Sequence, residues 1–68
     1  MCLQNEDKLH RTIVKEVYKD KDRNVLYDKD DYEIAAHIDE EYNIGDTVEF
    51  FMLSDELGIT EKQYNSDN

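Results

Sequence analysis

Carboxylates are the residues of this sequence whose number and spacing are best suited to chemistry. Residues 28–61 contain one base, Lys29, and twelve acids: Asp28, Asp30, Asp31, Glu33, Asp39, Glu40, Glu41, Asp46, Glu49, Asp55, Glu56 and Glu61. Residues 1–19 contain three acids and four bases, so nearly all of the formal charge of -10 comes from the later segment. Such a concentration of fixed anions can attract a cationic surface or, with suitable geometry, bind a metal ion.

Residues 20–31 partly match the ligand positions of a calcium-binding loop. The first, third, fifth, ninth and twelfth places of such a loop match Asp20, Asp22, Asn24, Asp28 and Asp31. However, the sixth place holds Val25 where the sharp turn needs glycine, and the twelfth lacks the bidentate glutamate. The flanking segments have strand patterns, so we expect a turn here and no bound calcium.

Catalytic signatures are missing from the sequence. Cys2 is the only cysteine and lies near the chain end, while His10 and His37 have no metal-ligand spacing. No glycine-rich phosphate loop, nucleophile elbow or zinc motif occurs. We therefore expect no enzyme and no cofactor, and a lone cysteine without a secretory leader predicts a reducing, cytoplasmic location.

The length of the chain limits the size of its core. With 68 residues it forms one small domain, 1–68, which buries only about 60% of the surface that the unfolded chain exposes. Residues 1–8 and 65–68 are polar and aperiodic, so we expect ragged ends. No apolar run approaches the roughly 20 residues of a membrane span. Because the chain has no disulfide or zinc site to support a small core, we expect a homodimer.

The first elements are predicted to be strands. From Leu9 to Tyr18 the residues alternate and are rich in β-branched side chains, which predicts a strand with Leu9, Ile13 and Val17 facing inward. Residues 20–24 have turn chemistry and precede the short apolar run 25–27. The two segments therefore read as a hairpin.

Residues 32–43 fit two structures. Tyr32, Ile34, Ala36 and Ile38 alternate as in a third strand. Equally, Ile34, Ile38 and Tyr42 have the spacing of a helix that Asp31 could cap and Gly45 could end. Both alternatives stay open on the sequence alone.

The last third predicts one clear strand and two weaker elements. Gly45 and Asp46 form a turn before a strand at 47–53, which has apolar residues on both faces. A capped helical turn is expected at 54–58, and an edge strand at 59–64. The fold class is therefore all-β or β-rich α+β: a small antiparallel sheet or partly open barrel of about four to five strands.

The run Gly45, Asp46, Thr47, Val48, Glu49 and Phe50 resembles the strand entry of small OB-like and SH3-like barrels. The likeness covers about a tenth of the chain. OB-type proteins bind nucleic acid through basic and aromatic residues, whereas this chain is acidic, so we expect no direct nucleic-acid binding.

The spacing of acidic side chains on a strand suggests that they imitate the phosphates of a nucleic acid. Alternate side chains of a strand stand about 6.6–6.8 Å apart, which is comparable with the spacing of phosphates. Tyr27, Tyr32 and Tyr42 lie among the acids, and exposed aromatic residues often anchor interfaces. The residues that we predict to bind a partner are Asp28, Asp30, Asp31, Glu33, Asp39, Glu40, Glu41, Asp46, Glu49, Asp55, Glu56 and Tyr42.

By size, charge and class, the chain resembles the small acidic DNA-mimic inhibitors that bacteriophages encode, including inhibitors of the nucleoid protein HU, of uracil-DNA glycosylase and of restriction. The resemblance implies a protein of the host cytoplasm whose acidic face fills the basic DNA-binding site of a partner such as HU. The alternative is an OB-like or SH3-like interaction module that regulates RNA polymerase or another host complex.

Overall fold

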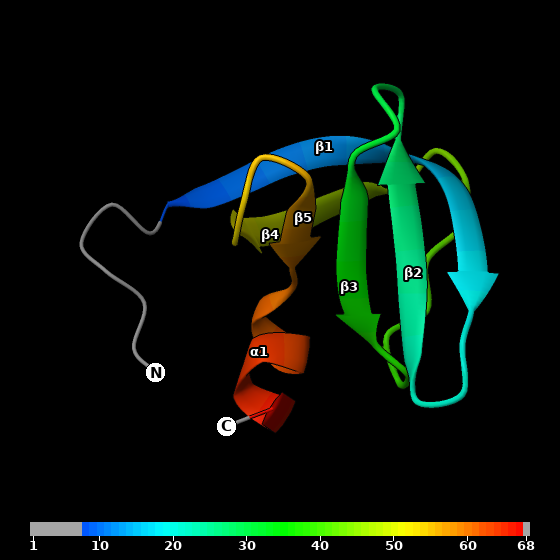
Figure 1. Ribbon diagram of the computed structural model, residues 1–68. Helices are drawn as coiled ribbons and strands as arrows, with labels where there is room; N and C mark the ends of the chain where they lie inside the picture. The colour runs from blue at the N-terminus through cyan, green and yellow to red at the C-terminus, as the bar shows by residue number, and fades with distance from the viewer. Residues whose placement is uncertain (1–7, 68) are drawn as a thin grey trace.

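The fold is a closed five-stranded barrel followed by a helix (Figure 1). A computed structural model describes residues 8–67. Its elements are β1 (Leu9–Lys19), β2 (Arg23–Asp28), β3 (Glu33–His37), β4 (Thr47–Met52), β5 (Leu57–Ile59) and α1 (Glu61–Asp67). The strand order is β1-β2-β3-β5-β4, and β1 also pairs with β4. The predicted small β-rich barrel of four to five strands is thus confirmed.

Two details of the barrel go beyond the prediction. The barrel is closed rather than partly open, because β1 is long enough to pair with β2 through one half and with β4 through the other. The sheet is mixed rather than antiparallel, since β3 and β5 run parallel. Closure removes the exposed strand edges that a small open sheet would have to protect.

The predicted inward face of β1 is wrong for two of its three residues. Val14 is 1% exposed, whereas Leu9 and Ile13 are each about half exposed. The pairing of β1 with β2 shifts between Val14 and Glu16, so a β-bulge reverses the alternation, and Val17 packs against the core as predicted. A period-two pattern cannot reveal such an inserted residue.

The segment that fitted both a strand and a helix is a strand. Ile34 and Ala36 are fully buried in β3, which pairs with β2 on one side and β5 on the other. Asp31 does not cap a helix; it has a φ of 62° in the turn before β3. Gly45 has a φ of 99° in the connection to β4, where a residue without a side chain is favoured.

The two weak C-terminal predictions are wrong. Residues 57–59 form β5 instead of a helical turn, because they close the barrel between β3 and β4. Most of the expected edge strand is α1, which also includes residues 65–67 of the predicted ragged end. Thr60 caps this helix: its Oγ1 accepts a hydrogen bond from the Gln63 backbone N–H at 3.3 Å. Thr60 and Gln63 have the spacing of a capping box, which was overlooked in the sequence.

The core fills the barrel and is small. It consists of Val14, Leu26, Ile34, Ala36, Val48 and Phe50, with Val17, Tyr32 and Tyr42 packed against it. The homodimer stays a prediction, because the structure describes one copy of the chain. Cys2 lies outside the described residues. Within residues 8–67, no helix has the length and apolar character needed to cross a membrane.

Candidate functional site

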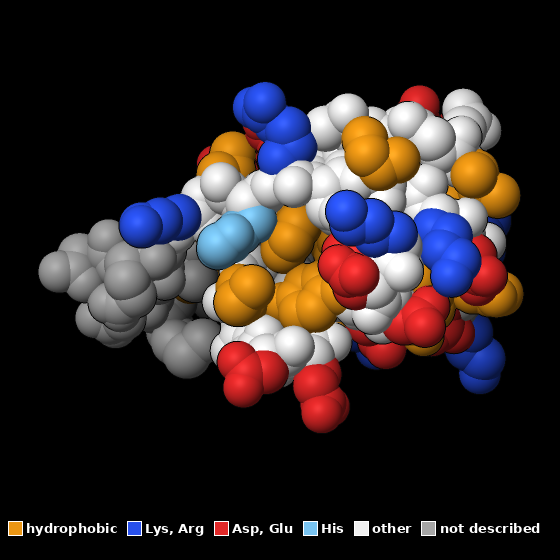
Figure 2. Space-filling view, turned by 90° about the horizontal axis from the view of Figure 1, so that it is seen from above, with side chains coloured by type: hydrophobic (Ala, Val, Ile, Leu, Met, Phe, Trp, Pro, Cys, Tyr) orange, Lys and Arg blue, Asp and Glu red, His pale blue; other side chains and the backbone are white. Residues whose placement is uncertain are grey.

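The β2–β3 and β4–β5 turns lie at the same end of the barrel (Figure 1). Residues of both turns line an acidic groove of about 590 Å³. We call it the barrel-end groove. Its lining residues are Tyr27, Asp28, Asp30, Asp31, Tyr32, Glu33, Phe50, Met52, Asp55 and Glu56. Six of these ten are acidic, and none is Lys or Arg. Seen from above this end, acidic side chains stand beside hydrophobic ones, and basic side chains also lie on this face (Figure 2).

Aromatic rings form the floor of the barrel-end groove. Phe50 of β4 and Tyr32 have ring centroids 5.5 Å apart, and His10 of β1 stacks on Phe50 at 5.6 Å. Gly58 of β5 allows this packing, because a Cβ at that position would lie 2.7 Å from Cδ2 of Phe50 and 3.0 Å from Cε2 of Tyr32. The floor therefore depends on β1, on the consecutive strands β4 and β5, and on Tyr32 in the turn before β3.

Tyr32 links the two turns that border the groove. Its hydroxyl donates a hydrogen bond to the backbone oxygen of Ser54 at 3.0 Å, across the gap from one turn to the other. Burial raises the pKa of Tyr32 above its ordinary value of 10.0, and the charges of Asp28 and Asp55 add to this effect. The hydroxyl thus stays protonated at neutral pH and keeps donating this bond.

Asp28 holds the β2–β3 turn together. The residue is 7% exposed, and its Oδ1 accepts the backbone N–H groups of Asp30 (2.8 Å) and Tyr32 (3.0 Å). Its Oδ2 accepts the hydroxyl of Thr12 at 3.2 Å. Asp28 therefore positions the turn, because its carboxylate already accepts donors of its own chain, and its contact with a partner stays a prediction.

The remaining acids of the groove are more available. Asp30, Asp55 and Glu56 are exposed, and Glu33 is half-buried and accepts the Tyr27 hydroxyl at 3.3 Å. Asp31 is also exposed and lies 3.5 Å from Nζ of Lys15. An exposed pair of this kind contributes little energy, so Lys15 can give way to a cation of a partner.

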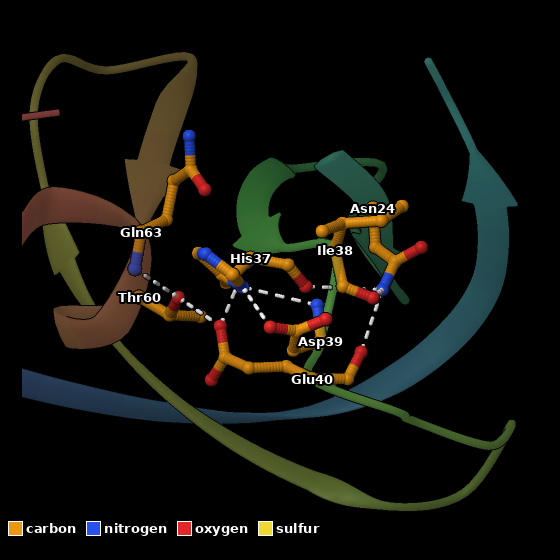
Figure 3. Close-up of polar contacts among 7 residues, drawn as sticks. All are labelled: Asn24, His37, Ile38, Asp39, Glu40, Thr60 and Gln63. Carbon is orange, nitrogen blue, oxygen red and sulfur yellow. Dashed lines mark hydrogen bonds and ion pairs between the residues drawn. The ribbon is translucent and has the colours of Figure 1, made fainter. Parts of the chain in front are cut away.

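Glu40, also predicted to bind a partner, belongs to a polar cluster at the β3–β4 connection (Figure 3). Its Oε2 accepts the His37 backbone N–H (2.8 Å) and the Thr60 hydroxyl (2.5 Å), and its Oε1 accepts the Tyr42 hydroxyl (3.1 Å). Asn24 donates from Nδ2 to the Glu40 backbone oxygen at 2.6 Å. Glu40 thus connects the loop to the start of α1, and its contact with a partner stays a prediction.

Tyr42 is held at the same place. It is half-buried against the core, and burial together with the nearby charge of Glu40 raises its pKa to about 12. This packing leaves only part of the ring for a partner, so the predicted anchor also serves as core.

The other predicted residues do not line the barrel-end groove. Asp39 lies 3.6 Å from Nδ1 of His37, and Asp46 accepts the Asn43 backbone N–H at 2.7 Å. Glu41 is exposed. Glu49 pairs with Arg11 at 2.8 Å and lines a separate groove of about 570 Å³ with Glu40 and Tyr42, which also contains Arg11 and Lys62. The structure thus brings together six of the twelve predicted residues and separates the rest.

Sequence reasoning missed the groove floor. Phe50 and Met52 fit a strand pattern, which does not show that they line a groove with the acids of the β2–β3 turn, far earlier in the chain. Tyr27 and Tyr32 stand next to the acids of residues 28–33 in the sequence. Their position beside these acids is the one sequence signal for an aromatic part of the site. Within the described part of the chain, no group of three or more His, Cys, Asp or Glu is arranged to hold a metal ion.

Comparisons with protein-family models, curated proteins and solved structures gave no match. Function is therefore inferred from the geometry and charge of the molecule itself.

Proposed function

We propose that this protein is a DNA mimic: it binds the basic DNA-binding surface of another protein, such as the nucleoid protein HU, and excludes DNA from it. The observation that carries the proposal is the barrel-end groove, where two linked turns hold carboxylates around an aromatic floor with no Lys or Arg in the lining. The partner would supply the lysines and arginines that normally pair with phosphates.

Rigidity supports this proposal. The β2–β3 turn is fixed by the three hydrogen bonds of Asp28, and the Tyr32–Ser54 bond fixes it relative to the β4–β5 turn. Carboxylates on fixed turns lose little conformational freedom on binding, so more of the electrostatic attraction is kept as affinity. Met52, which lines the groove and is 48% exposed, adds an apolar contact that a phosphate backbone does not offer.

The excess charge also supports a binding role. A net charge of magnitude about 2–8 is enough to keep a small domain in solution, and this chain carries -10. Mutual repulsion of the acids destabilises the fold, so a function that uses them explains their presence. In this proposal the protein acts in the cytoplasm, beside its partner, and does not itself bind nucleic acid.

Competition for HU tests the proposal. Direct binding of the protein to purified HU is measured at about 50 and 500 mM salt, and displacement of a fluorescent duplex DNA from HU is measured at the lower salt only, where HU holds the DNA. We expect tight binding of HU and release of DNA at the lower salt, and much weaker binding of HU at the higher, because exposed ion pairs are screened. Failure to displace DNA at low salt from HU and from other basic DNA-binding proteins would reject the mimic.

A charge-matched pair of variants tests the groove. One variant neutralises Asp30→Asn, Glu33→Gln, Asp55→Asn and Glu56→Gln, and spares Asp28 because the turn needs it. The control neutralises four exposed acids elsewhere: Asp22→Asn, Asp39→Asn, Glu41→Gln and Glu61→Gln. We expect the groove variant to lose about tenfold or more in affinity and the control much less. Equal losses would show that net charge alone drives binding.

A second candidate is the interaction module that regulates RNA polymerase or another host complex. Exposed apolar side chains favour it: Ile44 is 72% and Ile13 51% exposed, on neighbouring segments joined by hydrogen bonds of Val14. Binding through these residues would be insensitive to salt and would be lost in an Ile13→Ser, Ile44→Ser variant. Binding that falls steeply with salt and survives this variant would exclude the module.

A further inference from the structure

A second groove, of about 480 Å³, lies on the outer surface of the β1–β2 hairpin. We call it the tyrosine-pair groove. It is lined by Glu16, Tyr18, Lys19, Asp20, Val25, Tyr27 and Asp31. Tyr27 and Asp31 also line the barrel-end groove, so the two grooves meet at these residues.

The strand register explains how this groove is built. Glu16 of β1 lies opposite Tyr27 of β2, which lies opposite Glu33 of β3, so a tyrosine is flanked by a carboxylate on each side. Tyr18 lies opposite Val25, on the same outer face. The bulge in β1 permits this arrangement, because it changes which residues of β1 face outward after Val14.

The rings of Tyr18 and Tyr27 pack edge to face, nearly at right angles to each other. Their centroids are 5.7 Å apart and their planes meet at 79°. Tyr18 donates its hydroxyl to Oε1 of Glu16 at 2.6 Å, and Tyr27 donates to Oε1 of Glu33 at 3.3 Å. Each ring is thus held by a carboxylate at its polar end, while its aromatic surface is left to the groove.

Exposure makes the Tyr18 ring unusual. The residue is 54% exposed and is not among the residues packed against the core, so about half of its surface is open to solvent. A cation within about 6 Å of a ring centroid is attracted to its face, and arginine is the commoner partner because its flat guanidinium also stacks. The carboxylates of Glu16, Asp20 and Asp31 line the same groove and can accept its N–H groups.

We propose that the tyrosine-pair groove binds the guanidinium group of an arginine side chain from a basic protein. The arginine packs against Tyr18 and Tyr27 and donates hydrogen bonds to the lining carboxylates. This inference rests on the proposed function for the source of the arginine, and it gives the acidic face a preference for arginine over lysine. Lys19 is the one base in the lining and competes with the ligand.

A peptide titration tests the site without the partner. The probe is the peptide Gly-Arg-Gly-Arg-Gly-amide, compared with the same peptide containing lysine or the neutral isostere citrulline. Binding is followed through the ring-proton NMR signals of Tyr18 and Tyr27. We expect shifts that saturate at the lowest concentration with arginine, at a higher one with lysine, and not at all with citrulline. Citrulline binding as well as arginine would overturn the proposal.

Variants of Tyr18 then separate the contribution of its ring to binding from that of its hydroxyl. Tyr18→Leu removes the ring, and we expect arginine-peptide affinity to fall about two- to fivefold. Tyr18→Phe keeps the ring and should retain affinity within about twofold, while Lys19→Met should raise it. Unchanged affinity in Tyr18→Leu would overturn the proposal, as would ring shifts that are larger with a mononucleotide, which would indicate base stacking.

The outcomes distinguish this site from the proposed function. Saturable arginine binding in a protein that displaces DNA neither from HU nor from other basic DNA-binding proteins would keep the tyrosine-pair groove and reject the mimic. Displacement of DNA that is equally strong with Tyr18→Leu, together with no peptide-induced shifts, would keep the mimic and reject this groove.

Discussion

At the scale of single residues, neighbouring carboxylates do different work. Asp28 accepts two hydrogen bonds from its own turn and one from Thr12 of β1, while Asp30 is exposed in the lining of the barrel-end groove. Glu40 accepts three bonds and Glu41 is exposed. Residue type and chain position do not distinguish these cases, because the distinction depends on whether donors surround the carboxylate in the fold.

Replacing Asp28 tests its structural role. Asp28→Ala should lower the free energy of unfolding by about 1–3 kcal/mol, because the donors of the turn lose a buried acceptor. Asp30→Ala removes the same charge from an exposed position and should change stability by less than about 0.5 kcal/mol. Urea denaturation of both variants measures the difference, and equal effects would contradict the role assigned to Asp28.

The raised pKa of Tyr42 predicts how stability depends on alkaline pH. The ordinary pKa is 10.0 and the folded value is about 12, so the protonated form is favoured in the fold. This contribution is complete below pH 10.0 and is lost as pH rises through about 12, because the unfolded chain releases its proton first. Unfolding free energies measured from pH 9 upward should therefore fall in this interval. A Tyr42→Phe variant should show a shallower fall, and an unchanged slope would assign the effect to other groups.

At the scale of elements, short β5 controls both the fold and the groove. Its three residues pair with β3 on one side and β4 on the other, which closes the barrel. The same strand carries Gly58 beneath the rings of Phe50 and Tyr32. A strand this short has little preference of its own, so its conformation follows from its two neighbours.

Gly58→Ala should disturb the groove floor. The added methyl group would meet Cδ2 of Phe50 at 2.7 Å, so the ring must move, and overpacking of this kind costs about 1–3 kcal/mol. The same change in a Phe50→Leu background should cost less, because the contacting ring is gone. A double-mutant cycle in urea measures this coupling. Equal costs in both backgrounds would show that the ring does not make the limiting contact.

At the scale of the whole molecule, charge and size act together. The radius of gyration is 11.1 Å, and the Debye length in 0.1 M salt is about 10 Å. Below that ionic strength, repulsion among the acids therefore extends over the whole barrel. The same charges that would attract a basic partner work against the folded chain.

Salt should accordingly have opposite effects on folding and on binding. Raising NaCl from about 20 to 300 mM should increase the melting temperature by a few degrees, equivalent to roughly 1 kcal/mol, while it weakens binding to a basic partner. Thermal unfolding followed by circular dichroism measures the first effect. The variant with four neutralised acids outside the groove should show a smaller increase, and a melting temperature that falls with salt would contradict the role of repulsion.

The sequence by itself determined the β-rich class, the strands at β1 and β4, the β1–β2 hairpin and the acidic stretch. These follow from alternation, turn residues and composition, which are local properties of the chain. Asp30, Asp55 and Glu56 lie exposed on turns, and turn residues have a local signature in the sequence. Their binding of a partner stays a prediction.

Only the tertiary structure decided between strand and helix at 33–37, placed β5, and sorted the acids into those that accept hydrogen bonds inside the fold and those that stay exposed. Residues 33–37 form a strand because β3 is paired on both edges in the closed barrel. The bulge in β1 changed which of its residues face the core. Packing between distant segments placed Phe50 in one groove with the acids of the β2–β3 turn. Each of these outcomes depends on contacts between residues far apart in the chain, and local patterns contain no information on which distant segments will meet.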